Sequence, residues 1–319
     1  MFLDIIYIFV GVALVLWGAD RLTEGAASLA RRLNVPEIVI GLTIVAAGTS
    51  APELFVSVVS ALNDTPDLAV GNVVGSNIMN TLLIVGVAAM VAPMVISRST
   101  VRKDIPFTVG SSLLLLVLCL DGFASLAIGG NTISRFDGIL LLAAFALFMV
   151  YTFSVAKKDS ATDNSPAAKP IAAWVSVAFV VLGLACLVVG SNLFVSSATN
   201  VAAALGVSQS VIGLTIVAGG TSLPELATSV VAARKGQSAI AIGNVIGSNV
   251  FNILFILGLT AVICPMEIGG ITLIDLLVML LAAVFVWLFS FTKYRVERWE
   301  GAVLTACYLS YLGWLLYNI

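Results

Sequence analysis

The feature that most constrains this chain is a succession of apolar runs, most of them 20 residues or longer, separated by short polar breaks. A helix needs about 20 mostly apolar residues to cross a bilayer. The runs lie near residues 2–31, 37–62, 67–92, 103–121, 136–156, 171–200, 208–233, 238–264, 272–292 and 300–318. This pattern predicts an all-α integral membrane protein with ten transmembrane helices.

The composition supports the same class of protein. Of the 319 residues, 60% are hydrophobic and 10% are charged, whereas soluble domains are roughly 45–50% apolar and about 25% charged. A soluble enzyme, a secreted disulfide scaffold and a disordered chain are therefore excluded. The net charge of −2 gives no indication of nucleic-acid binding, and the absence of histidine excludes histidine-ligated metal sites and histidine bases. The four scattered cysteines are expected to be buried apolar side chains.

The basic residues predict the orientation, because Lys and Arg concentrate in cytoplasmic loops. Arg135 alone falls on one side of the ten-helix arrangement. The other side carries Arg21, Arg31, Arg32, Arg98, Arg102, Lys103, Lys157, Lys158, Lys169, Arg234, Lys235, Lys293, Arg295 and Arg298. We therefore expect a multi-pass protein of a prokaryotic inner or plasma membrane, with both termini outside and the polar linker 157–170 in the cytoplasm. That linker is interpreted as a tether, because it has few acidic residues for sensing an ion.

The chain contains two copies of one unit. Residues 41–53 read GLTIVAAGTSAPE and residues 213–225 read GLTIVAGGTSLPE, so that eleven of thirteen positions are identical at an offset of 172. The same offset relates GNVVGSN at 71–77 to GNVIGSN at 243–249, and Asn80 to Asn252. The predicted units are 1–156, with its motif at 41–80, and 171–319, with its motif at 213–252. Because each unit holds five spans, the copies are inverted, which is typical of secondary transporters.

Two acidic residues stand out among the 17 in the chain. Glu53 and Glu225 fall in the middle of apolar runs at equivalent positions of the two copies, and no Lys or Arg lies mid-span to pair with them. A charge at the bilayer centre costs about 2.5–3.5 kcal/mol on insertion scales. These residues therefore predict a functional site. The alternative is that both carboxyl groups are simply protonated.

The residues before each glutamate predict a broken helix. Proline lacks an N–H and clashes with the carbonyl four residues back, so we expect breaks near Gly48–Pro52 and Gly219–Pro224, each helix restarting with proline in its first turn. Freed carbonyls are tolerated at this depth only where they line a cavity or meet an ion. Candidate oxygen donors are Ala46, Thr49, Ser50, Ala218, Thr221 and Ser222, with Ser76, Asn80, Ser248 and Asn252 on the facing spans.

All of these donors are oxygens. Hard cations such as Ca²⁺ take 6–8 oxygen ligands, whereas copper, zinc and iron favour sulfur or imidazole. Close helix packing through small residues is an alternative interpretation of the GNVVGSN and GNVIGSN motifs. Packing alone does not require asparagine at matching positions, such as Asn72 and Asn244.

At these motifs the sequence resembles the calcium/cation antiporter superfamily, specifically the prokaryotic sodium/calcium exchangers. GTSAPELFVS with GNVVGSNIMN, and GTSLPELATS with GNVIGSNVFN, are similar to the two alpha-repeats of that family. The resemblance covers essentially the whole chain. It implies a Na⁺-driven Ca²⁺ antiporter that works by alternating access, with the first and sixth spans sliding past the rest. It implies no enzyme activity and no cofactor, and its partners are Ca²⁺, Na⁺ and the lipid bilayer; no obligate protein partner is evident.

The resemblance also implies ligands for the transported ions. The central Ca²⁺ site is expected to use Glu53, Glu225, Thr49 and Thr221. The Na⁺ sites are expected to use Ala46, Thr49, Ser50, Glu53, Ser76, Ala218, Thr221, Ser222, Glu225 and Ser248. The asparagines Asn72, Asn80, Asn244 and Asn252 are expected to support the central site. Many relatives have aspartate at one of the two positions held here by Asn80 and Asn252, so this chain offers two carboxylates.

Three other functions remain as alternatives. Exchange of Ca²⁺ or another cation for H⁺ could use the same two glutamates, because a buried carboxyl group can carry a proton. A passive channel would allow uptake without a gradient of a counter-ion. An intramembrane enzyme is disfavoured, because the chain has no histidine and no paired aspartates in mid-span.

Overall fold

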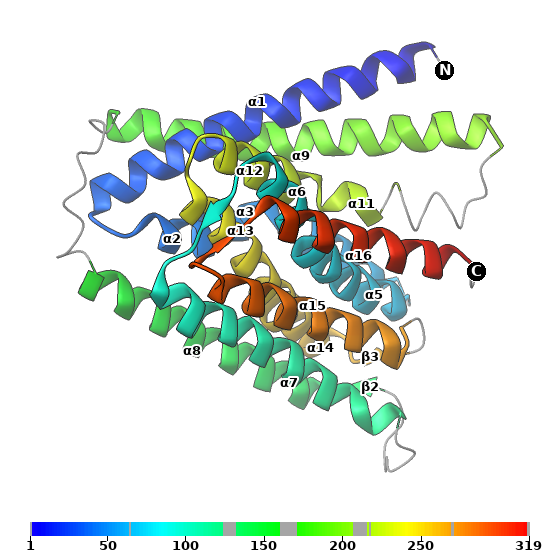
Figure 1. The fold of residues 1–319 in the computed structure, drawn as a ribbon. Coiled ribbons are helices and arrows are strands. Elements are labelled where there is room, and N and C mark those ends of the chain that lie inside the picture. The colour runs from blue at the N-terminus through cyan, green and yellow to red at the C-terminus, as the bar shows by residue number, and fades with distance from the viewer. Residues whose placement is uncertain are drawn as a thin grey trace.

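A computed structural model describes residues 2–63, 65–123, 132–159, 171–206, 216, 218–268 and 271–317. These residues are mostly helical (Figure 1). By length and apolar composition, six of the described helices could cross a bilayer, or seven if the bent pair Glu37–Thr49 and Ala51–Leu62 forms one span. The start of the predicted run 208–233 and most of the linker 157–170 lie outside the described residues.

The described helices fall within the predicted apolar runs or extend a few residues beyond them. The first half contains α1 (Phe2–Leu33), α2 (Glu37–Ile40), η1 (Gly41–Val45), α3 (Ala46–Thr49), α4 (Ala51–Leu62), α5 (Pro66–Ile78), η2 (Met79–Ile84), α6 (Val85–Val91), β1 (Met94–Val95), η3 (Thr100–Asp104), α7 (Ile105–Phe123), β2 (Thr132–Ile133) and α8 (Arg135–Asp159). The second half contains α9 (Ala173–Ala204), α11 (Ala218–Thr221), α12 (Leu223–Arg234), α13 (Ser238–Val250), η5 (Phe251–Leu257), α14 (Gly258–Ile263), β3 (Met266–Glu267), α15 (Leu273–Phe291), β4 (Arg295–Val296) and α16 (Arg298–Tyr317). The η segments are wider, π-helical turns within longer helices.

The distribution of side chains is that of a protein surrounded by hydrocarbon. Large apolar side chains such as Phe55, Phe136 and Trp174 are 70–75% exposed. Charged and amide side chains such as Glu53 and Asn252 are completely buried. Because lipid tails are as apolar as leucine, exposed aromatic rings cost little in a bilayer, and the polar groups gather where other protein atoms surround them.

The two longest helices, α1 and α9, pack against each other in antiparallel directions through a stripe of small residues. At intervals of seven residues, Gly11, Gly18 and Gly25 on α1 face Gly190, Gly183 and Ser176 on α9. A Cβ atom added to Gly18 would lie 2.8 Å from the carbonyl oxygen of Gly183. The stripe therefore lets the two backbones approach more closely than larger residues would permit.

Two short antiparallel sheets, which the sequence did not predict, join loops of this mostly helical fold. β1 pairs with β4, and β2 pairs with β3. Each sheet joins loops that are far apart in the sequence, and its strands are too short to be recognised by side-chain alternation. β1 and β3 are related by the offset of 172 that relates the two copies of the motif.

Both marked termini lie at one end of the long helices, on the right of the view, whereas α8 ends and α9 begins at the opposite end (Figure 1). α12 and α13 contact η1, α3 and η2 of the first half, so the broken helices of both halves meet in the interior. The candidate site lies at this meeting point.

Candidate functional site

The two predicted helix breaks are present at equivalent positions. Ser50 separates α3 from α4 with φ −82° and ψ 6°, and the helix axis bends by 46° there. Ser222 separates α11 from α12 with nearly the same angles, φ −88° and ψ 7°. Pro52 and Pro224 lie in the first turns of the restarted helices, where a missing N–H leaves no hydrogen bond unmade.

Glu53 and Glu225 follow these prolines, and both side chains are completely buried. Each carboxylate accepts a hydrogen bond from the break serine of the opposite half. Ser222 Oγ donates to Glu53 Oε1 at 3.1 Å, and Ser50 Oγ donates to Glu225 Oε1 at 3.1 Å. These reciprocal bonds bring together two segments that are 172 residues apart in the chain.

The second oxygen of each carboxylate has no hydrogen-bond partner among the described residues. Glu53 Oε2 and Glu225 Oε2 are both buried and accept no hydrogen bond from the described residues. None of the ion pairs formed by the described residues includes either glutamate. Because a buried charge is stable only when it is paired or bound to a metal ion, these two oxygens are suited to a cation.

Neutral oxygens surround Glu225. Thr49 Oγ1 lies 3.1 Å from Asn244 Oδ1 and 3.3 Å from the carbonyl oxygen of Ala46. It also lies 3.5 Å from Ser248 Oγ, which is itself 3.5 Å from Glu225 Oε1. Together with Ser50, these residues place five of the predicted site residues around the carboxylate of Glu225.

The other half is described in less detail. Thr221 is half-buried at the end of α11, next to the completely buried Ser222. Ala218 begins α11, and its side chain lies outside the described part of the chain. Ser76 is buried in α5, but the hydrogen bonds of the described residues do not connect it to Glu53. The structure places Ser76 in the interior without assigning it a contact at the site.

Asn72 and Asn244 hold the broken helices in place. Asn72 Nδ2 donates to the carbonyl oxygen of Glu53 at 3.3 Å and to Ser57 Oγ at 3.1 Å. Asn244 Nδ2 donates to the carbonyl oxygen of Glu225 at 3.3 Å and to Ser229 Oγ at 3.0 Å. One bond of each amide goes to the carbonyl of the glutamate itself and the other to a serine hydroxyl about one turn further along, so the two bonds together fix the direction of the helix that carries the carboxylate.

Asn80 and Asn252 occupy equivalent positions in η2 and η5 but have different surroundings. Within the described residues, neither the oxygen nor the nitrogen of the Asn80 amide has a hydrogen-bond partner, although the residue is completely buried. Asn252 Nδ2 donates to Asn77 Oδ1 at 3.1 Å, and Asn252 Oδ1 has no partner in the same described set. Wide π-helical turns are frequent at functional sites, and here each one places a buried amide in the interior.

A second amide network crosses between the halves, and the sequence analysis did not include it in the site. Asn77 Nδ2 donates to the carbonyl oxygen of Asn249 at 3.3 Å, and Asn249 Nδ2 donates to Thr81 Oγ1 at 2.7 Å. Asn77 and Asn249 are the last residues of the two repeated GSN motifs. Because Asn77 and Asn249 occupy equivalent positions of the two copies, the repeat in the sequence could have indicated that both belong to the site.

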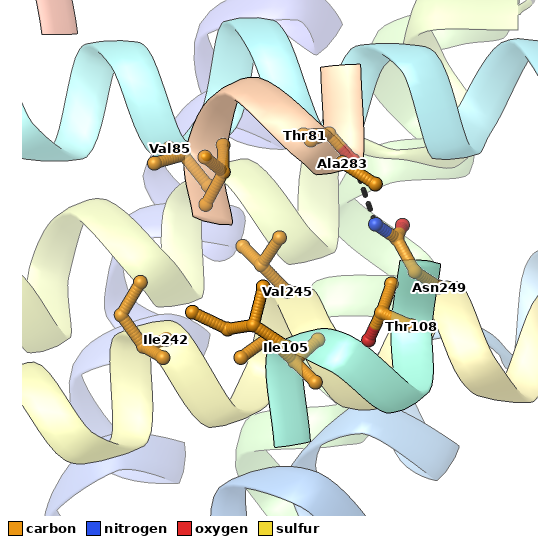
Figure 2. Close-up of a pocket in the computed structure, with 10 residues that line it drawn as sticks. Thr81, Val85, Ile105, Thr108, Ile242, Val245, Asn249 and Ala283 are labelled. Carbon is orange, nitrogen blue, oxygen red and sulfur yellow. Dashed lines mark hydrogen bonds between the residues drawn. The ribbon is translucent and has the colours of Figure 1, made fainter. Parts of the chain in front are cut away.

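A cavity of about 20 Å³ lies beside this network. Figure 2 shows Asn249 with its hydrogen bond to Thr81, above aliphatic side chains that include Ile105 and Val245. This volume is about that of one water-sized sphere. The cavity is therefore too small and too apolar to be the ion site. The carboxylate oxygens Glu53 Oε2 and Glu225 Oε2 are a better indication of where a cation would bind.

Three further buried acids lie at the starts of helices. Asp104 accepts a hydrogen bond from Tyr151 at 3.1 Å, and Asp275 accepts one from Tyr311 at 2.8 Å. Glu300 Oε2 accepts a hydrogen bond from the backbone N–H of residue 297 at 2.7 Å. Glu300 Oε1 has no hydrogen-bond partner among the described residues. All three acids nevertheless lie near the start of a helix and not at a break in mid-span, so they do not form a pair like that of Glu53 and Glu225.

The donor set selects the kind of ion. Among the described residues, no group of three or more His, Cys, Asp or Glu side chains could hold a metal ion. The site instead combines two carboxylates with hydroxyl, amide and carbonyl oxygens. Such oxygens suit Ca²⁺ and other hard cations and not the metals that need sulfur or imidazole.

Comparison with known proteins places the chain among cation exchangers. The family model described as sodium/calcium exchanger protein matches residues 3–154 and 175–317. The chain is 40% identical to the putative antiporter CaxA of Alkalimonas amylolytica, over 98% of each protein. It is 38% identical to the inner membrane protein YrbG of Escherichia coli, over 99% of this chain and 97% of YrbG.

Two further relatives carry the exchanger name. The chain is 33% identical to the sodium/calcium exchanger MaX1 of Methanosarcina acetivorans, over 98% of this chain and 99% of MaX1. A solved structure of the sodium-calcium exchanger NCX_Mj, soaked with Na⁺ and Ca²⁺, superposes with a TM-score of 0.83 at 31% identity and covers 98% of both chains. The likeness thus extends over the whole fold.

Proposed function

This chain belongs to the sodium/calcium exchanger family, a family of membrane antiporters and not of enzymes, and we propose that it exchanges Na⁺ for Ca²⁺ by alternating access. The observation that carries the proposal is the reciprocal arrangement of Glu53 and Glu225. Each carboxylate is completely buried and hydrogen-bonded to a serine of the opposite half, and one oxygen of each accepts no hydrogen bond within the part of the chain that the structure describes.

In this proposal Ca²⁺ binds between the two carboxylates. Glu53 and Glu225 supply the charge, and Thr49 and Thr221 supply neutral oxygens at the two helix breaks. The Na⁺ sites use the same glutamates and threonines together with Ala46, Ser50, Ser76, Ala218, Ser222 and Ser248. Asn72 and Asn244 position the broken helices, while Asn80 and Asn252 line the central site. The contacts of Thr49 with Asn244 and Ser248 support this assignment.

Charge balance makes competition between the two ions possible. One Ca²⁺ neutralises two carboxylates, and so do two Na⁺. If three Na⁺ enter for each Ca²⁺ that leaves, one net positive charge moves inward per cycle. Each such charge contributes about 2.3 kcal/mol per 100 mV of membrane potential, which favours Ca²⁺ export from a cell with a negative interior.

The proposed architecture is ten crossings in two inverted halves, 1–156 and 171–319, joined by a cytoplasmic linker at 157–170 in the inner membrane of a prokaryote. Three observations support it. The offset of 172 relates the helix breaks, the two glutamates, and the hydrogen bonds that Asn72 and Asn244 donate to the glutamate carbonyls. The two termini share one end of the long helices (Figure 1). One relative is named as an inner membrane protein.

Exchange of Ca²⁺ for H⁺ is the second candidate, and the same unpartnered Oε2 atoms favour it, because each could hold a proton in place of a metal ion. The two candidates differ in their driving ion. A pH gradient without Na⁺ would drive Ca²⁺ uptake only in the second case.

The test is transport by the purified chain in vesicles. Vesicles loaded with Na⁺ are diluted into Na⁺-free medium that contains radioactive Ca²⁺. The proposal predicts rapid Ca²⁺ uptake that stops when the Na⁺ gradient is collapsed, and that is lost in Glu53→Gln and in Glu225→Gln. Undiminished uptake by either variant would overturn the site, and uptake driven by pH alone would replace Na⁺ with H⁺.

A further inference from the structure

An apolar groove of about 290 Å³ lies between the α1–α9 pair and the broken helix α12. It is separate from the ion site, because every side chain that lines it is a hydrocarbon. The lining residues are Val12, Val15 and Leu16 of α1, Val87 of α6, Phe194 of α9, and Leu223, Leu226, Ala227 and Val230 of α12.

The groove lies along the middle of the helices and opens outward. Its α1 residues are near the centre of that 32-residue helix. On α12 it extends from Leu223, next to the break, to Val230, one turn before the helix ends. Val12 is 40% exposed and Leu16 is 53% exposed. A groove at this depth in a membrane protein opens onto lipid chains and not onto water.

Basic side chains lie just beyond the Val230 end of the groove. Lys235 Nζ pairs with Asp20 Oδ1 at 2.6 Å, and Arg21 pairs with the same aspartate at 3.1 Å. Arg234, at the last position of α12, is exposed. Arg21 also pairs with Glu24, so the two acids are matched by Arg21 and Lys235. Arg234 forms no ion pair among the described residues and adds a positive charge at this end of α12.

We propose that this groove binds one acyl chain of a bilayer phospholipid, with the phosphate group beside Arg234 and Lys235. Water would find no hydrogen-bond partner in the groove, whereas a hydrocarbon chain gains contacts with all of its walls. A helix of another protein is about 10–12 Å across, so a volume of 290 Å³ would hold only about two residues of it. An unbranched acyl chain is much thinner and can lie along the groove. Basic residues at the membrane surface attract the phosphate of the same lipid.

The repeat offers a natural substitution for the test. Ala227 lies at the position equivalent to Phe55 of the first half, so its small side chain helps to keep the groove open. Ala227→Phe and Val230→Phe place a ring in the groove. Val150→Phe is the matched control, because Val150 is 65% exposed on α8 and does not line the groove.

The experiment reconstitutes the full chain in vesicles of phosphatidylglycerol and phosphatidylethanolamine that contain a trace of phosphatidylglycerol with a photoactivatable acyl chain. After illumination, mass spectrometry maps the labelled peptides. We expect the wild-type chain to be labelled within 12–16 and 223–230. We expect that labelling to fall at least tenfold in both groove variants. In Val150→Phe it should equal the labelling of the wild-type chain.

Native mass spectrometry of the same proteins in mild detergent counts the bound lipids. We expect one retained phospholipid in the wild-type chain and in Val150→Phe, and none in the groove variants. Labelling of the wild-type chain that avoids both segments, or a retained lipid in the groove variants, would overturn the proposal. The wild-type map alone decides the question if a variant fails to fold, and neither measurement depends on ion transport.

Discussion

At the scale of single residues, the site depends on hydrogen bonds that cross between the two halves. Ser50 and Ser222 each donate to the carboxylate of the other half. A hydrogen bond to a charged group contributes about 1.5–3 kcal/mol. These serines therefore position the carboxylate oxygens, and any loss should appear in the affinity for the cation.

We predict that Ser50→Ala and Ser222→Ala each weaken Ca²⁺ binding by about 10- to 100-fold, since 1.4 kcal/mol corresponds to a tenfold change in affinity. Titration of the purified variants with Ca²⁺ measures this. Ser154→Ala is the control, because Ser154 is exposed and bonds only to its own helix among the described residues. Wild-type affinity in both break variants would contradict the role of the serines.

The two central asparagines give a prediction about stability. Asn80→Asp removes no hydrogen bond of the described residues. Asn252→Asp removes the N–H that donates to Asn77 Oδ1 and places a carboxylate oxygen against that amide oxygen, so that two acceptors face each other. We predict that Asn252→Asp lowers the free energy of unfolding by about 1–3 kcal/mol more than Asn80→Asp. Thermal unfolding in saturating Ca²⁺ measures the difference, and equal losses would show that the amide of Asn252 does not matter.

At the scale of helices, the glycine stripe determines how closely α1 and α9 approach. A Cβ atom added to Gly183 would lie 2.7 Å from the backbone nitrogen of Leu22, so Gly183→Ala requires the helices to separate. Gly110 in α7 is the matched position, because a Cβ atom added there meets nothing within 4 Å. The two glycines thus separate packing from helix propensity.

We predict that Gly183→Ala lowers the free energy of unfolding by about 1–3 kcal/mol, the usual cost of overpacking. Gly110→Ala should be neutral or stabilise the protein by up to about 1 kcal/mol, because alanine is the better helix former. Thermal unfolding of both variants in one detergent gives the comparison. If Gly183→Ala has the same free energy of unfolding as the wild-type chain, α1 and α9 can separate at little cost, and the prediction is contradicted.

The helix breaks could be predicted from the sequence because their cause is local: a proline that follows Gly, Thr and Ser disfavours a continuous helix through that point. The pairing of Glu53 with Ser222 could be expected only in outline, from the repeat. The β1–β4 and β2–β3 pairs and the bond from Asn252 to Asn77 join segments more than 100 residues apart. Such contacts depend on the packed fold, and no local pattern specifies them.

At the scale of the whole molecule, the internal symmetry explains why the site lies where it does. Contacts in one half recur in the other at an offset of 172, as in the bonds of Asn72 to Ser57 and of Asn244 to Ser229. In the proposed inverted arrangement, a pseudo-two-fold axis brings equivalent residues close to each other only near the axis itself. We propose that the two glutamates lie there, because an alternating-access transporter binds its cargo between such halves.

The proposed orientation predicts which loops are accessible from each side. In a cysteine-free background, Tyr317→Cys should react with a membrane-impermeant maleimide added outside intact cells, and Arg98→Cys should react only after the membrane is opened. Both residues are exposed, so a difference in labelling reports the side of the membrane. Labelling of both from the same side would contradict ten crossings with the linker inside.

The most direct test of the central claim is the number of Ca²⁺ ions bound by the purified chain and by its two glutamine variants. We predict one high-affinity Ca²⁺ per chain that Na⁺ displaces, with binding reduced at least 100-fold in Glu53→Gln and in Glu225→Gln. Asp275→Asn, which removes an acid away from the site, should bind Ca²⁺ as the wild-type chain does. Wild-type Ca²⁺ binding in either glutamine variant would show that the ion does not lie between the two carboxylates.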